Sequence, residues 1–179
     1  MIRVAELRDV GRLLEIYAPY VTDTAITLEY DVPSPEAFQA RYERICAQYP
    51  WLVWEEDGRV LGYAYADRAL ERAAYQWDAD LSIYLDGSAR GRGIGAALYE
   101  CLIDQLRALG YCNLYALITG SNETSLRFHE RFGFKSQGRL ARSGYKFGQW
   151  HDVYWYALRL EENMIRPRPP RRFVGELLR

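Results

Sequence analysis

A glycine-bearing loop near the middle of the chain is the segment best suited to hold an anion. Residues Arg90–Gly95 read RGRGIG and lie between the apolar run 81–85 and a helical segment that opens at Ala96. Backbone N–H groups that no side chain crowds can point from such a loop at one spot, and the helix start and two arginines add positive charge. The segment therefore predicts a binding site for a phosphate ester.

The spacing of the loop argues against two common phosphate sites. It lacks the Gly-Lys-Ser/Thr ending of a P-loop, which disfavours nucleoside triphosphate chemistry. It also lacks the Gly-x-Gly-x-x-Gly pattern of a dinucleotide fold, because its glycines fall at 91, 93 and 95. An ordinary turn at a glycine-rich helix entry remains the alternative that the loop alone leaves open.

A second segment, residues 122–134 (NETSLRFHERFGF), follows after a further helix and strand. Together the two segments resemble the GNAT family of acetyl-CoA-dependent N-acetyltransferases. Arg90, Gly93 and Gly95 fit the family's Arg/Gln-x-x-Gly-x-Gly/Ala loop, and the second segment fits its Asn-x-x-Ser/Ala-x-x-x-Tyr/His-x-x-x-Gly-Phe/Tyr helix. The segments 74–77, 127–130 and 144–153 narrow the resemblance to the phosphinothricin and methionine sulfoximine acetyltransferases, over roughly residues 1–160.

The order of the predicted elements, β-α-α-β-β-β-α-β-α-β-β, is that of an α/β (α+β) domain. The resemblance implies the GNAT-like form of it, a mixed, mostly antiparallel twisted sheet of about seven strands with helices on both faces. The strands ending at Leu85 and Ile118 should form a parallel pair joined through the helix 93–109. Asp9 should cap a helix that ends near Pro19, and Ser34 should cap another. Asp57-Gly58 should form a hairpin turn, and the last two strands should span 134–141 and 153–160.

The resemblance assigns the acetyl-CoA contacts. The diphosphate goes to the N–H groups of the glycine loop, and the peptide-like pantetheine arm pairs with the strand before it, where relatives open a gap between two parallel strands. Asn122 is the expected partner of the arm's amides, with a plain helix cap as the alternative. The predicted cofactor-binding residues are Ile83, Tyr84, Leu85, Arg90, Gly91, Arg92, Gly93, Ile94, Gly95, Ala96, Asn122 and Ser125.

Two residues are candidates for proton transfer. Asp80 stands where the resembling branch carries a glutamate, so the carboxylate is kept with a shorter reach. An ordinary aspartate, with a pKa of about 3.9, is a weak base, so we expect Asp80 to act through water or to position the ammonium group. His129 matches the Tyr/His position, where an imidazolium would protonate the departing thiolate, and the alternative is a structural helix-face residue.

Several residues are candidates for the acceptor site. Ala73, Ala74 and Tyr75 precede the catalytic strand, and Lys146 would meet a carboxylate or phosphinate oxygen or else be an exposed turn lysine. Phosphinothricin enzymes carry an arginine where Glu29 falls. An acid there should repel an anionic substrate head, which weakens the transfer of that specificity to this chain.

Composition excludes several classes of function. The chain has 179 residues and a formal net charge of -1, which gives no general field for nucleic acid or an anionic membrane surface. No apolar run approaches a membrane span, and no signal peptide precedes the first predicted strand. The three cysteines, Cys46, Cys101 and Cys112, form no metal or disulfide pattern. We therefore expect a cytoplasmic protein without a metal.

The last residues, 161–179, are rich in proline and arginine. We expect a GNAT-like domain over 1–160 followed by a partly disordered tail. The alternative is an arm that packs on a partner subunit through Phe173, Val174, Leu177 and Leu178. The resemblance also implies a homodimer, because relatives pair through their C-terminal strands.

These patterns favour a small-molecule N-acetyltransferase. The acetyl group would pass from acetyl-CoA to a primary amine, the α-amino group of an amino acid or analogue, by direct attack in a ternary complex. None of the cysteines has a nucleophile's setting, which is compatible with the absence of an acyl-enzyme. A protein or peptide amine acetyltransferase and an inactive acyl-CoA-binding module remain alternatives.

Overall fold

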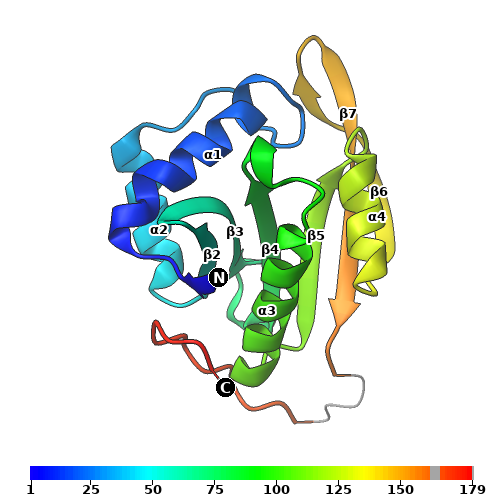
Figure 1. The fold of residues 1–179 in the computed structure, drawn as a ribbon. Helices are drawn as coiled ribbons and strands as arrows, with labels where there is room; N and C mark the ends of the chain where they lie inside the picture. Colours follow the sequence, from blue (N-terminus) through cyan, green and yellow to red (C-terminus); the bar gives the residue numbers. More distant parts are fainter. Residues whose placement is uncertain (162–165, 179) are drawn as a thin grey trace.

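The computed structural model describes residues 1–161 and 166–178. Seven strands form one sheet in the order β1-β2-β3-β4-β5-β7-β6, in which β4 and β5 run parallel and the other neighbours antiparallel (Figure 1). The predicted mixed, mostly antiparallel GNAT-like sheet is confirmed. The strands are β1 (Ile2–Val4), β2 (Trp51–Glu56), β3 (Arg59–Arg68), β4 (Asp78–Leu85), β5 (Asn113–Thr119), β6 (Lys135–Lys146) and β7 (Gln149–Arg159); the helices are α1 (Val10–Thr22), α2 (Pro35–Cys46), α3 (Ile94–Leu109) and α4 (Glu123–Arg131).

The helices cover both faces of the sheet. The ring of Tyr84 on β4 meets Tyr17 and Tyr20 of α1, whereas its neighbours Ile83 and Leu85 lie beside Gly95 of α3. Successive side chains of a strand point to opposite faces, so α1 and α3 pack on opposite sides. Ring contacts join α2 to α1 and α4 to α3. No helix of the described residues is long and apolar enough to cross a membrane.

Local signals placed most helix ends and one turn correctly. The Ser34 hydroxyl accepts a hydrogen bond from the backbone of Ala37 at the start of α2. Asp57 and Gly58 both have positive φ in the β2–β3 turn, as a type I′ hairpin requires. The start of α1 after Asp9 is as predicted, whereas its predicted end near Pro19 was wrong. The helix continues through Pro19 to Thr22, because Asp23 N–H still reaches the Pro19 carbonyl.

Asp9 does not cap α1 with its side chain. Its carboxylate turns back instead to the backbone N–H of Glu6, 2.7 Å away, and to the Arg3 guanidinium at 2.7 and 2.9 Å. These charge-assisted hydrogen bonds outcompete a single backbone donor. The Arg3 side chain and these backbone contacts hold the pKa of Asp9 below its usual range against the opposing effect of burial. Asp9 therefore ties β1 to the turn before α1.

The last hairpin is longer than predicted. Strands β6 and β7 meet at a tight turn in which Phe147 and Gly148 have positive φ, and the hairpin rises beyond the rest of the sheet (Figure 1). The pairing register shifts between Leu140 and Gly144, and Arg142 has positive φ. This irregularity interrupts the alternation of side chains that marks a strand in sequence. The outer half of the hairpin was therefore not predicted from the sequence.

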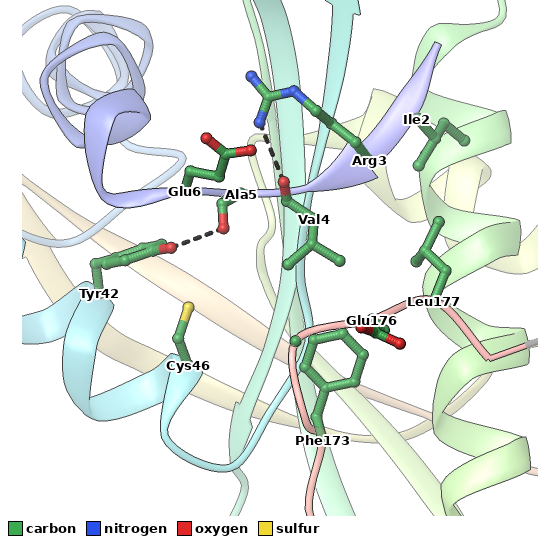
Figure 2. A pocket seen from close by; sticks show the side chains of 11 residues that line it. Ile2, Arg3, Val4, Ala5, Glu6, Tyr42, Cys46, Phe173, Glu176 and Leu177 are labelled. Carbon is green, nitrogen blue, oxygen red and sulfur yellow. Dashed lines mark hydrogen bonds between the residues drawn. The ribbon is translucent and has the colours of Figure 1, made fainter.

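The described part of the tail packs on its own chain, whereas a partly disordered tail was expected. Phe173 is 4% exposed and belongs to the core, and its N–H donates to Gln48 O. Arg171 donates to the last carbonyls of α3. Figure 2 shows Phe173 and Leu177 facing β1 across a pocket that contains none of the predicted site residues. Residues 162–165 and 179 lie outside the described residues, and the boundary at residue 160 stays a prediction.

Phe173→Ala should lower the free energy of unfolding by about 3–5 kcal/mol, because the substitution leaves a cavity in a packed core. Urea unfolding followed by circular dichroism measures this loss. Val174→Ala is the matched control, since that neighbouring side chain is 77% exposed and should change stability little. Equal stability of the two variants would show that the tail does not contribute to the core.

Candidate active site

The sheet opens between its two parallel strands. Strands β4 and β5 share only three paired positions, from Asp78↔Asn113 to Asp80↔Tyr115. Beyond Asp80, β4 stays paired with β3 up to Leu85, while β5 stays paired with β7 up to Thr119. The two halves of the sheet therefore diverge from Asp80 onward, and one backbone edge of β4 faces the gap.

The backbone groups of β4 that face this gap follow from the pairing. Asp86 N–H donates to Leu61 O of β3, so by alternation the peptide groups of Tyr84 also face β3. Those of Leu81 and Ile83 face the gap. The Tyr20 hydroxyl occupies the place beside Leu85, donating to its carbonyl at 2.7 Å and accepting from its N–H at 3.1 Å. Of the three residues predicted to pair with a pantetheine arm, Ile83 to Leu85, only Ile83 has backbone groups that face the gap and are not bonded to Tyr20. Leu81, which was not predicted, also has backbone groups that face the gap.

The glycine loop lies at the mouth of the gap. Gly91 and Gly93 have φ of +74° and +78°, and Gly93 is the N-cap of the 16-residue α3. The first N–H groups of a helix have no acceptors within it, so those of Ile94, Gly95 and Ala96 are available to an anion. A Cβ on Gly95 would stand 3.1 Å from Leu85 Cδ1, so glycine lets the helix start lie against the end of β4.

The two arginines of the loop occupy different surroundings. The Arg90 guanidinium lies over the Tyr20 ring, 5.7 Å from its centroid. Arg92 donates to both carboxylate oxygens of Glu56 at 2.8 Å. An anion bound at the loop would therefore compete with Glu56 for the Arg92 guanidinium.

His129 does not have the chemistry expected of a proton donor. It is 3% exposed, and its Nδ1 lies 2.8 Å from the Ser125 carbonyl and 3.2 Å from the Ser125 hydroxyl. A carbonyl only accepts, so Nδ1 carries the proton, and burial lowers the pKa of the ring. The imidazole is therefore neutral, and its unprotonated Nε2 has no hydrogen-bond partner among the described residues. Asn122 caps the same helix, its Oδ1 accepting from Ser125 N–H at 3.2 Å.

Asp80 lies at the fork where the strands separate. It is half-buried, and its Oδ1 is shielded from solvent with no hydrogen-bond partner in the described chain. Burial, and secondarily the charge of Asp67, raises the pKa of Asp80 to about 7. This pKa is higher than that of the ordinary aspartate on which the expectation of an indirect role was based, because a carboxylate that loses water binds a proton more tightly. Asp80 therefore suits direct proton transfer near neutral pH.

The residues predicted to bind the acceptor amine lie in two different surroundings. Ala73, Ala74 and Tyr75 form an exposed 3-10 turn just before β4, with Tyr75 41% exposed. Lys146, in contrast, is 2% exposed, and its ammonium donates to Val21 O at 2.7 Å and Thr27 O at 2.8 Å. The suggestion that Lys146 meets a substrate oxygen was wrong, because its charge is committed to two backbone carbonyls. It fixes the loop between α1 and α2 onto the last hairpin.

Glu29 also has a different role from the one expected. Its Oε1 lies 2.5 Å from Arg41 Nη2 of α2, so the acid is neutralised within the protein. The Arg41 guanidinium in turn lies over the rings of Tyr17 and Phe38. An anionic acceptor would therefore meet an ion pair and not a bare negative charge.

Sequence analysis missed Tyr20, Arg41 and Asp67. Tyr20 replaces a neighbouring strand at Leu85, which lies 65 positions away in the sequence. Asp67 is the residue directly opposite Asp80 in the β3–β4 ladder. The turn at Asp57-Gly58 joins β2 to β3 and does not set the β3–β4 register, so the pairing of Asp67 with Asp80 could not be counted from it.

A parallel strand pair that opens beside a glycine-bearing helix start defines an acyl-CoA-binding transferase site. The profile described as "Acetyltransferase (GNAT) domain" matches residues 2–155, and this chain belongs to that family. It is 33% identical to the phosphinothricin N-acetyltransferase of Streptomyces viridochromogenes over 95% of this chain and 91% of that one. It is 32% identical to the L-methionine sulfoximine/L-methionine sulfone acetyltransferase of Salmonella typhimurium over 90% and 95%.

The fold is shared with a solved relative. The structure of a GNAT superfamily phosphinothricin acetyltransferase from Sinorhizobium meliloti in complex with AcCoA aligns with a TM-score of 0.90 at 35% identity. The alignment covers 94% of this chain and 92% of the other. Together the family and its relatives identify the chain as an acetyl-CoA-dependent N-acetyltransferase. The described residues contain no cluster of three or more groups that would bind a metal ion.

Gly93→Ala should raise the KM for acetyl-CoA about tenfold, because a side chain strains the left-handed backbone by about 1 kcal/mol or more and shifts the N–H groups of the loop. Steady-state kinetics with varied acetyl-CoA measure the change. Gly87→Ala is the matched control, because that nearby glycine lacks positive φ and has open space around its Cβ position. An unchanged KM in Gly93→Ala would remove the loop from the binding site.

Proposed function

We propose that the protein transfers an acetyl group from acetyl-CoA to the α-amino group of a small amino acid or amino-acid analogue. The names of its relatives, which act on phosphinothricin and methionine sulfoximine, support this substrate class. The observation that carries the proposal is the position of Asp80, a half-buried carboxylate with a shielded, unpartnered Oδ1 at the fork of β4 and β5. A primary amine that reaches this fork meets a base next to the gap in which the thioester would lie.

Proton transfer follows from the basicity of Asp80. Acetyl-CoA supplies the acetyl thioester, and the acceptor arrives as an ammonium ion with a pKa of about 10. Asp80 takes one proton from the ammonium, which frees the nitrogen lone pair to attack the thioester carbonyl. The nitrogen loses a second proton as the amide forms, and the CoA thiolate takes one up. The complete reaction therefore releases one proton, and it needs no covalent acyl-enzyme.

Two other functions compete with this proposal. A protein or peptide amine acetyltransferase would use the same fork but accept a larger amine. An inactive acyl-CoA-binding module would retain the loop and the gap without turnover. Thiol release from acetyl-CoA distinguishes the three with a panel of methionine sulfoximine, phosphinothricin, free amino acids and peptides. Turnover on peptides alone, or binding without any turnover, would overturn the small-molecule proposal.

Asp80→Asn should reduce kcat by about 10²–10⁴-fold, since the amide cannot accept the proton. It should also stabilise the protein at pH 8 by at most about 4 kcal/mol, because the folded state no longer holds a buried charge there. The raised pKa means that this cost grows from about pH 4 to about pH 7 and then stays constant, so the gain should vanish below pH 4. Unfolding curves and initial rates test both effects, with Asp57→Asn in the exposed turn as the control.

We also propose that two chains form a dimer through the last hairpin. Leu140, Tyr145, Phe147 and Trp150 are all exposed large apolar side chains of β6, β7 and the turn between them. Such a patch on a protruding hairpin is typical of an interface. Light scattering should give about twice the chain mass of 20.9 kDa at micromolar concentration, and Trp150→Lys should lower it. The control is Leu7→Lys, and a monomer in the wild type excludes the dimer.

A further inference from the structure

A second carboxylate lies directly beside Asp80. Asp67 and Asp80 are paired positions of the antiparallel strands β3 and β4, which run next to each other in the sheet (Figure 1). Directly opposed residues of such a pair project from the same face with Cβ atoms about 4.5–5.5 Å apart. The two acidic side chains therefore share one face of the sheet at the fork.

The two carboxylates have different partners. Asp67 accepts from Arg44 of α2 through two parallel hydrogen bonds, Nη1 to Oδ1 at 2.9 Å and Nη2 to Oδ2 at 2.7 Å, and from the N–H of Arg68 at 2.7 Å. Asp67 and Arg44 thus form a bidentate ion pair. The shielded Oδ1 of Asp80 has no such partner in the described chain. One acid of the pair thus has a cationic partner, while the other has an oxygen left open to a proton.

The tyrosines around Asp80 are uncharged at neutral pH. Burial raises the pKa of each surrounding tyrosine, and the charge of Asp80 contributes for Tyr65, Tyr84 and Tyr99. Asp78, on the same strand, is hydrogen-bonded to Asn113. The groups that face or adjoin Asp80 are Asp67 and Tyr65 on β3, Asp78 and Tyr84 on β4, Tyr115 on β5, Tyr99 on α3 and, through Asp67, Arg44 on α2.

We propose that Asp67, clamped by Arg44, is a positioning residue that keeps the Asp80 carboxylate basic enough to take a proton from the acceptor amine. The Asp67 anion disfavours a second negative charge beside it, which strengthens proton binding by Asp80. Arg44 limits this effect by neutralising part of the Asp67 charge. The Asp67–Arg44 ion pair thereby sets how strongly the short side chain of Asp80 binds a proton. This inference rests on the proposed role of Asp80 as the base.

The test is the pH dependence of kcat/KM with methionine sulfoximine, or with the best amine of the panel. In the wild type, activity should fall below about pH 7 as Asp80 becomes protonated. Asp67→Asn should move this acidic limb down by about one pH unit and lower the plateau, because Asp80 becomes a weaker base. Arg44→Gln should move the limb in the opposite direction, because it leaves the Asp67 charge uncompensated.

Three comparisons make the outcome decisive. Asp57→Asn removes one carboxylate at a distant turn and should leave the limb in place. A drop in kcat or in the unfolding midpoint with an unmoved limb in Asp67→Asn would show a merely structural role and overturn the inference. A limb that moves in the same direction in Asp67→Asn and Arg44→Gln would also overturn the inference. Because the Arg44 side chain is mostly exposed, Arg44→Gln should fold even if Asp67→Asn does not.

The failure of the proposed function would look different. If Asp80→Asn retains wild-type activity, the base is elsewhere and both proposals fall. If Asp80→Asn is inactive while Asp67→Asn keeps the wild-type limb, only the coupling to Asp67 is lost. Asp67→Glu adds a further check, since it restores the charge and should return the limb toward its wild-type position.

Discussion

The separation of β4 from β5 after three paired positions is the constraint on which the rest of the site depends. Each half of the sheet keeps its own strand pairing, so the gap lies along the edge of β4 that has no partner strand beyond Asp80. Unpaired backbone groups inside a protein are costly, so this edge favours a ligand that supplies hydrogen-bond partners to it. Tyr20 closes the end of the edge at Leu85, which leaves Leu81 and Ile83 as its open positions.

The same fork explains the chemistry of Asp80. A carboxylate at the point where two strands diverge is shielded by both yet hydrogen-bonded by neither, because the strand backbones pair with each other below it. Desolvation there makes the group basic at the expense of stability. The shorter aspartate side chain keeps the carboxylate close to the sheet, where this shielding is strongest.

Local chemistry predicted the fold well and the site only partly. Ser34, Gly93 and the Asp57-Gly58 turn act on their immediate neighbours, and their effects were visible in sequence. Lys146 was misjudged because its partners, Val21 and Thr27, lie more than 100 positions away. The pKa of Asp80 was also out of reach, since it depends on burial and on the β3–β4 register. The prediction of a partly disordered tail was wrong for its described part, because composition gave no sign that Phe173 fills a core position.

Charge neutralisation decides what an acceptor meets. Glu29 is paired with Arg41, Asp67 with Arg44, and the ammonium of Lys146 with two backbone carbonyls. Paired charges contribute less field than bare ones, whereas Oδ1 of Asp80 has no hydrogen-bond partner among the described residues. Under the proposed function, the carboxylate of Asp80 is therefore the group at the fork best placed to attract an ammonium ion. Lys146 and Arg41, whose charges are already paired, instead fix the loop between α1 and α2 to the last hairpin and to α2.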